Sequence, residues 1–176
     1  SRGSVSLLQL PVAVDIEAQP TLHWRWCVTK PAPGTDLSEK GEDDRSLAIY
    51  VAFPFVAAEA SAFEKLERKI IEKTAGKDAP GRVLMYVWGG KLERGAVVSS
   101  PYMGDSAMMK ILRSSRTPTG QWFEEQIDIA DDYRTAFGSE PPDPIYIAIS
   151  ADTDDTDSAS KGIVMDLEFL TEDRIF

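Results

Sequence analysis

The sequence predicts an all-β protein, an antiparallel β-sandwich of jelly-roll type with eight to ten strands, one inserted helix and one short helix. The main observation is that apolar and polar residues alternate in short runs, as they do along a strand with one buried face. Glycine, proline, aspartate and serine separate these runs at a spacing typical of sandwiches. A chain of 176 residues with 43% hydrophobic and 27% charged residues has an ordinary globular composition. We therefore expect a single sandwich domain over residues 1–176.

Six runs carry the strongest strand pattern. In the first, Leu22, Trp24 and Trp26 share one face, which we expect to be the core face, and Arg25 lies on the other. The last run is expected to turn four side chains inward, those of Ile163, Met165, Leu167 and Phe169. The strong runs cover residues 22–28, 47–53, 83–88, 123–129, 145–149 and 163–169, and weaker ones cover residues 5–10, 12–16, 97–102 and 107–113.

Two segments have the spacing of helices instead. Apolar residues recur at helical intervals from residue 57 to 73, and Gly76 stops the pattern, so we expect a helical insertion at about 57–75. A shorter helix is expected after Asp131, whose carboxylate can cap it, and Gly138 is expected to end it. The insertion lies between strands and is interpreted as a decoration of the sandwich.

Charge and composition exclude several classes of function. The net charge is −10 and the isoelectric point is near 4.6, which disfavours nucleic-acid binding and docking on an anionic membrane. No apolar run is long enough to span a bilayer, and residues 1–10 lack the layout of a signal peptide, so no signal or anchor is expected in this chain. One cysteine, Cys27, and one histidine, His23, leave little room for a disulfide, a zinc site or a catalytic triad.

The most suggestive candidate site is an acidic loop before the last strand. Asp152, Asp154, Asp155 and Asp157 place four carboxylates within six residues, and carboxylate oxygens are the ligands that calcium prefers. The loop lacks the central glycine and distant glutamate of an EF-hand. A structural calcium ion is therefore one prediction, and a simply solvated loop is the alternative.

Aromatic side chains form a second candidate. Tyr50, Tyr86 and Trp88 alternate with clearly apolar residues and are expected to lie on the opposite face of their strands. Such a face can stack sugar rings or other planar ligands. It can equally be a face that the inserted helix covers.

A third candidate is polar. Arg25 lies opposite the tryptophan face, and Asp43, Asp44 and Arg45 stand at the entry to the next strand. If these strands are neighbours, Arg25 pairs with Asp43 or Asp44. Such a cluster is either a structural ion pair or a set of donors and acceptors for a carboxylate or a sugar hydroxyl.

Several segments together resemble a known family. They include residues 20–28, 34–37, 40–45, 49–53, 86–88, 132–134 and 147–154, together with Trp122, Phe137 and Gly138. In order and spacing they resemble the bacterial family called domain of unknown function 3047, over roughly residues 12 to 170. The resemblance implies a secreted or periplasmic protein with no assigned reaction. The strand layout is also similar to that of jelly-roll carbohydrate-binding modules, a likeness of fold that supplies no function.

Three functions follow as expectations. The first is a non-catalytic extracytoplasmic module that binds a carbohydrate or another polar ligand through Arg25, Asp43, Asp44, Arg45, Tyr50, Tyr86 and Trp88. The second is an accessory subunit that docks on a larger protein assembly, which can be membrane-associated. The third is a glycoside hydrolase with paired carboxylates, in which Glu125, on an otherwise apolar face, is the obvious acid. The residues favour a protein that is not an enzyme, because no nucleophile or phosphate-binding loop accompanies the single histidine.

Overall fold

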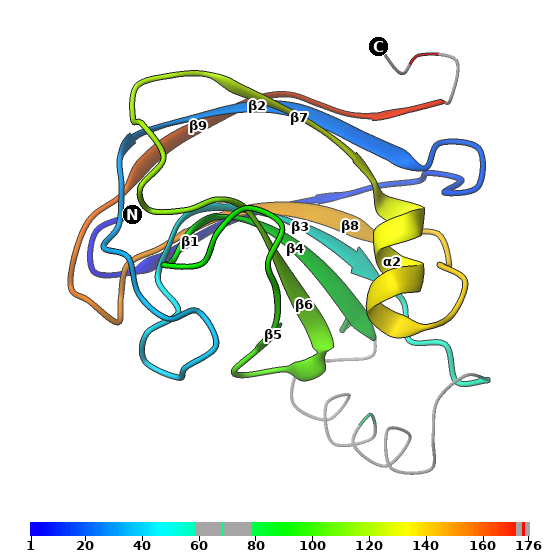
Figure 1. Ribbon diagram of the computed structural model, residues 1–176. Helices are drawn as coiled ribbons and strands as arrows, with labels where there is room; N and C mark the ends of the chain where they lie inside the picture. Colours follow the sequence, from blue (N-terminus) through cyan, green and yellow to red (C-terminus); the bar gives the residue numbers. More distant parts are fainter. Residues whose placement is uncertain (59–67, 69–78, 172–173, 175–176) are drawn as a thin grey trace.

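Two β-sheets lie face to face, and their inner faces enclose the main core (Figure 1). The structure is a computed structural model that describes residues 1–58, 68, 79–171 and 174. One sheet has six strands in the order β1-β8-β3-β4-β6-β5, and the other has three in the order β7-β2-β9. The elements are β1 (Val5–Pro11), β2 (Thr21–Lys30), β3 (Arg45–Phe53), β4 (Arg82–Gly89), β5 (Val97–Ser100), β6 (Gly104–Arg113), β7 (Phe123–Asp128), α2 (Ile129–Phe137), β8 (Tyr146–Asp152) and β9 (Lys161–Leu170). The all-β sandwich is confirmed.

The nine strands of the described residues fall within the predicted range of eight to ten. The weaker candidate at residues 12–16 forms no strand. Neighbouring strands run antiparallel except β4 and β6, which are parallel because β5 carries the chain back between them. The jelly-roll type of the sandwich stays a prediction.

Aromatic rings fill the space between the sheets. Trp24 and Trp26 of β2 are fully buried, as the alternation in this strand predicts. Their partners across the core are Tyr86 and Trp88 of β4, with ring centroids 5.7 Å apart for Trp24 and Tyr86 and 5.4 Å apart for Trp26 and Trp88. The prediction that Tyr86 and Trp88 lie on the face away from the core, whether as a ligand platform or beneath the inserted helix, is therefore wrong. Both are fully buried, so neither can stack on a ligand at the surface.

The far side of the six-stranded sheet explains this error. Val83, Met85 and Val87 of β4 point away from the second sheet, and they too are buried, in a second apolar cluster. A strand that is apolar on both faces has no alternation to show which face meets the other sheet. Tyr50 does lie on this far side, where it is half-buried and its hydroxyl accepts a hydrogen bond from Ser150 at 3.0 Å.

Strand β9 departs from the predicted alternation at one residue. Asp166 has a φ of 55° and forms a bulge, so two residues of β9 oppose Trp24 of β2. After the bulge in sequence, Leu167 and Phe169 pack inward as predicted. Ile163 and Met165 instead face outward, with 46% and 39% of their surface exposed, so the prediction for these two residues is wrong.

Helix α2 closes one end of the sandwich (Figure 1). Its amino-terminal cap is Asp128, whose carboxylate accepts from the backbone N–H of Asp131 at 2.8 Å; the expected cap, Asp131, lies in the first turn instead. Gly138 ends the helix at a φ of 71°, as predicted. Tyr133 then packs against Phe53 of β3, with 4.6 Å between ring centroids.

The predicted insertion at about 57–75 falls mostly outside the described residues. Within it the structure describes residues 57, 58 and Arg68, and Arg68 is helical and donates to the carbonyl oxygens of Ala79 and Pro80. Among the described residues, no helix has the length and apolar character that crossing a membrane requires.

Replacing Tyr86 with phenylalanine tests the buried phenol at the helix end of the core. Tyr86 donates to Asp132 at 3.1 Å, and the loss of this bond is expected to lower the free energy of unfolding by about 1 kcal/mol. Burial raises the pKa of Tyr86 well above its ordinary value, and the charge of Asp132 raises it further. The unfolded phenol therefore ionises first, and the wild type loses this contribution as the pH rises above about 10. Urea titrations at pH 8 and pH 11 should show a steeper alkaline loss for the wild type than for Y86F; equal losses would contradict the assignment.

Candidate functional site

Carboxylates gather where β3 begins and β8 ends. Arg45 and Asp152 are register partners on these neighbouring strands, so the loop before β3 meets the loop after β8. We call this place the acidic corner and define it by Asp43, Asp44, Arg45, Asp152, Asp154 and Asp155. The polar cluster predicted at the entry to β3 and three of the four predicted calcium ligands are thus parts of one site.

The guanidinium of Arg45 lies at the centre of the acidic corner. It donates to Asp43 at 2.9 Å and to Asp152 at 2.6 Å, and all three side chains are over 90% buried. Pairing and charge-assisted hydrogen bonds offset the desolvation of these groups. Arg45 therefore fixes the position of one acid from each loop.

Asp44 binds the backbone of the opposite loop. It is fully buried, and its carboxylate accepts from the backbone N–H of Asp155 at 3.2 Å and of Thr156 at 3.0 Å, and also from the Thr156 hydroxyl. In return, the backbone N–H of Asp43 donates to the Asp155 carboxylate at 3.2 Å. These reciprocal bonds fix the loop after β8 in place.

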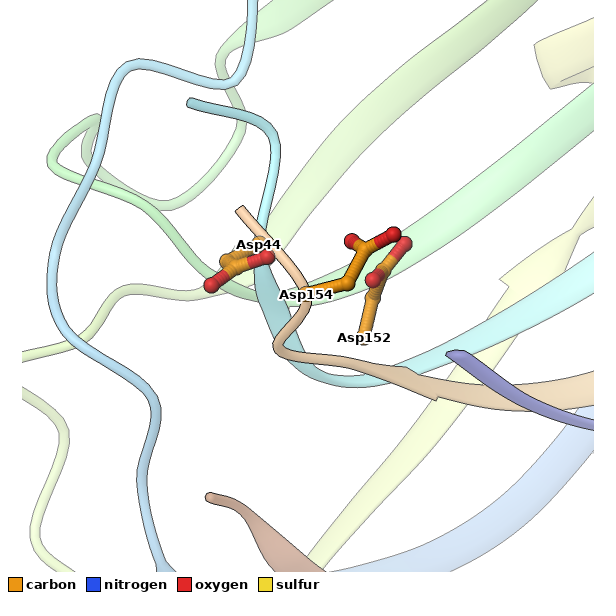
Figure 2. Close-up of side chains that lie close together, drawn as sticks. All are labelled: Asp44, Asp152 and Asp154. Atoms are coloured by element: carbon orange, nitrogen blue, oxygen red, sulfur yellow. The ribbon is translucent and has the colours of Figure 1, made fainter. Parts of the chain in front are cut away.

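Three carboxylates of the acidic corner converge. Figure 2 shows Asp152 and Asp154 side by side with Asp44 next to them, and one oxygen from each lies within 4.8 Å of the other two. Oδ1 of Asp152 is buried and has no hydrogen-bond donor among the described residues. Burial raises the pKa of Asp152 to about 6, with Asp154 adding to the rise and Arg45 opposing it. Burial raises the pKa of Asp43 as well, against the effect of Arg45.

The predicted calcium set and the observed cluster differ in membership. Asp44, which comes from another loop, joins the cluster, while Asp155 and Asp157 do not contribute to it. Asp155 faces Asp43, and Asp157 stands at a left-handed turn with a φ of 47°. Asp44 was predicted as a ligand-binding residue from its neighbours in sequence, but a single sequence has no signal that pairs it with a loop 110 residues later.

Arg25 lies elsewhere, on the outer face of the three-stranded sheet. Strands β2 and β3 belong to different sheets, so the predicted pair with Asp43 or Asp44 is wrong. Arg25 instead binds Asp166 of β9 at 2.6 Å, with about 43% of its side chain exposed. Its guanidinium carbon lies 6.0 Å from the ring centroid of Trp122, which is 46% exposed. Trp122 was not predicted as a site residue, although a tryptophan two residues after a turn glycine, Gly120, and just ahead of a strand is a usable signal.

Further polar side chains continue this face. His23 alternates with Arg25 on β2, and its Nε2 lies 2.9 Å from the Glu124 carboxylate on β7. We call Trp122, Arg25, Asp166, His23 and Glu124 the Trp122 platform. It offers one exposed indole ring beside the Arg25 guanidinium, with further donors and acceptors on the neighbouring strands.

Glu125, the acid that the alternative of a glycoside hydrolase would use, is enclosed between the sheets with 2% of its surface exposed. Its carboxylate accepts from Arg113 at 2.7 Å, from Arg94 at 2.9 Å and from the indole N–H of Trp26 at 3.1 Å. These donors occupy both oxygens and leave no access for a substrate. The geometry gives Glu125 a structural role.

The fold and these sites define a two-layer β-sandwich protein with an acidic corner and an exposed polar platform. The chain belongs to the family described as protein of unknown function (DUF3047), whose model matches residues 1–168. No curated protein matches the chain.

Substituting Glu125 by glutamine tests its structural role. The amide keeps the shape but removes the charge that Arg94 and Arg113 bind, and breaking a buried ion pair leaves its partners uncompensated. We expect a loss of about 2 to 3 kcal/mol in the free energy of unfolding, measured with urea. Glu124→Gln, one residue away on the exposed face, is the matched control and should change stability by less than about 0.5 kcal/mol. Equal stabilities of the two variants would exclude this role.

Proposed function

We propose that this chain is a non-catalytic, extracytoplasmic module that binds a carbohydrate-like ligand on the Trp122 platform. The observation that carries the proposal is the exposed indole of Trp122 beside the Arg25 guanidinium. An apolar ring flanked by hydrogen-bonding groups matches a sugar, which presents C–H groups on its face and hydroxyls at its rim.

The charges of the platform suit a neutral, polyhydroxylated ligand. Arg25 donates hydrogen bonds and Asp166 accepts them, and the two already hold each other in position at 2.6 Å. On the other side of Arg25, His23 and Glu124 form a second pair. Because Arg25 is paired with Asp166 and His23 with Glu124, the platform has no excess positive charge to select an anion.

The extracytoplasmic location belongs to the proposal and rests on the family resemblance. A structural calcium ion also belongs to it, and calcium is bound by extracellular modules at millimolar concentrations. The enclosed position of Glu125 supports binding over carboxylate catalysis.

A glycan array followed by calorimetry with the best ligand tests the platform. Trp122→Ala is expected to weaken binding at least about tenfold, because an aromatic contact and its buried area are lost. The variant should retain the wild-type melting temperature, since the ring is exposed. Tyr102→Ala, which removes another exposed ring in the turn between β5 and β6, is the control and should bind like the wild type. An array without any binder, or full affinity in W122A, would refute the proposal.

A second candidate, an assembly subunit, is favoured by strand β1. This edge strand is uncharged and exposed along its whole length, and four large apolar side chains cover it: Val5, Leu7, Leu8 and Leu10. Edge strands of monomeric proteins are usually protected by charge, twist or a covering segment, because their free backbone groups pair with other strands.

Replacing Leu8 with lysine tests this second candidate. Leu8 is 68% exposed, so the lysine should leave the fold intact while its charge opposes strand addition. If β1 docks on a partner, the wild type at native abundance should sediment above the mass of a monomer, and L8K should sediment as a monomer. A monomeric wild type would count against an assembly.

A further inference from the structure

The acidic corner has more negative charge than its one cation neutralises. It holds one guanidinium, that of Arg45, and five carboxylates, those of Asp43, Asp44, Asp152, Asp154 and Asp155. Arg45 uses its two terminal nitrogens on Asp43 and Asp152. In the described part of the chain, neither Asp44 nor Asp154 has a salt-bridge partner. Carboxylates this close repel one another unless a cation or a proton lies between them.

An unsatisfied oxygen marks the position of the missing charge. The Asp152 side chain is 8% exposed, and its Oδ1 is buried without a donor among the described residues. Leaving a buried charged oxygen unpaired is costly, so such atoms normally have a partner. Figure 2 shows this carboxylate turned toward that of Asp154, where a bound ion would contact both.

The ligand set suits calcium. Calcium takes six to eight oxygen ligands at about 2.3–2.6 Å in flexible geometry, so two ligands of one ion can be up to about 5.2 Å apart. One oxygen each of Asp44, Asp152 and Asp154 lies within 4.8 Å of the other two, which is compatible with such a shell. Magnesium demands near-ideal octahedral geometry and usually keeps several of its waters, so we expect a set of three protein carboxylates to favour calcium.

We propose that Asp44, Asp152 and Asp154 bind one calcium ion that ties the start of β3 to the loop after β8. Asp154 is exposed, so the ion has a route from solvent and water completes its coordination. Asp44 already holds the backbone of Asp155 and Thr156, and the ion adds a second link between the same two loops. The inference rests on the structural calcium ion of the proposed function and names its ligands, but it does not depend on the Trp122 platform, which lies on the other sheet.

Binding of this ion is measured on the full chain after EDTA treatment and dialysis. Equilibrium dialysis with radioactive calcium should give one site per chain. A ligand that binds only the folded state stabilises it, and at ten times the dissociation constant the melting temperature should rise by about 3–6 °C. Magnesium chloride and sodium chloride at equal ionic strength serve as the other arms and should give at most a small part of this shift.

Two aspartates of the same loop provide matched variants. Asp154→Asn removes one ligand charge from an exposed residue that no described hydrogen bond depends on, so the variant should fold and lose calcium binding at least about tenfold. Asp157→Asn removes a charge outside the cluster at a left-handed residue that asparagine tolerates, and it should bind like the wild type. The proposal is overturned if no calcium binds, if magnesium acts equally, if D154N binds like the wild type, or if D157N loses binding.

Discussion

The contact between the tryptophans of β2 and the aromatic residues of β4 is the constraint on which the rest of the sandwich depends. Trp26 packs edge-on against Trp88 at 5.4 Å and thereby joins the two sheets. A buried indole N–H needs an acceptor, and Glu125 supplies it. A buried carboxylate in turn needs cations, which Arg94 and Arg113 provide. The burial of Trp26 thus accounts for three polar residues, namely Glu125, Arg94 and Arg113.

The unequal width of the two sheets decides which surfaces are open. Three strands cannot cover six, so β1 at the edge of the wider sheet keeps its side chains in solvent. The centre of the wider sheet is instead apolar and buried on both faces. The outer face of the narrow sheet mixes charged side chains with exposed apolar ones, among them Trp122, Ile163 and Met165. The acidic corner lies in the loops at one end of the wider sheet, and the Trp122 platform lies on the outer face of the narrow sheet. At both places the packing of the core leaves the choice of side chain largely free.

The alternation of apolar residues predicts the strands and the core face of β2, because this strand is polar on one side. It fails for β4, where both sides are apolar and the inward residues, Tyr86 and Trp88, look no different from their neighbours. The acidic loop is visible in the sequence as a local run. Its partner Asp44 is not, because only the pairing of β3 with β8 brings that residue close. Local patterns therefore predict elements, while membership of a site depends on the topology.

The bulge at Asp166 changes which residues of β9 point into the core, from Val164 before it to Leu167 and Phe169 after it. One extra residue lets a single strand satisfy two different neighbours, with Phe169 packed in the core and Met165 touching the Arg25 guanidinium outside. The exposed Met165 beside Arg25 thus owes its position to a backbone irregularity and not to the composition of the strand. In evolutionary terms, a change of one residue in length at this point exchanges the inward and outward side chains on one side of the bulge, while the other half of the strand keeps its faces.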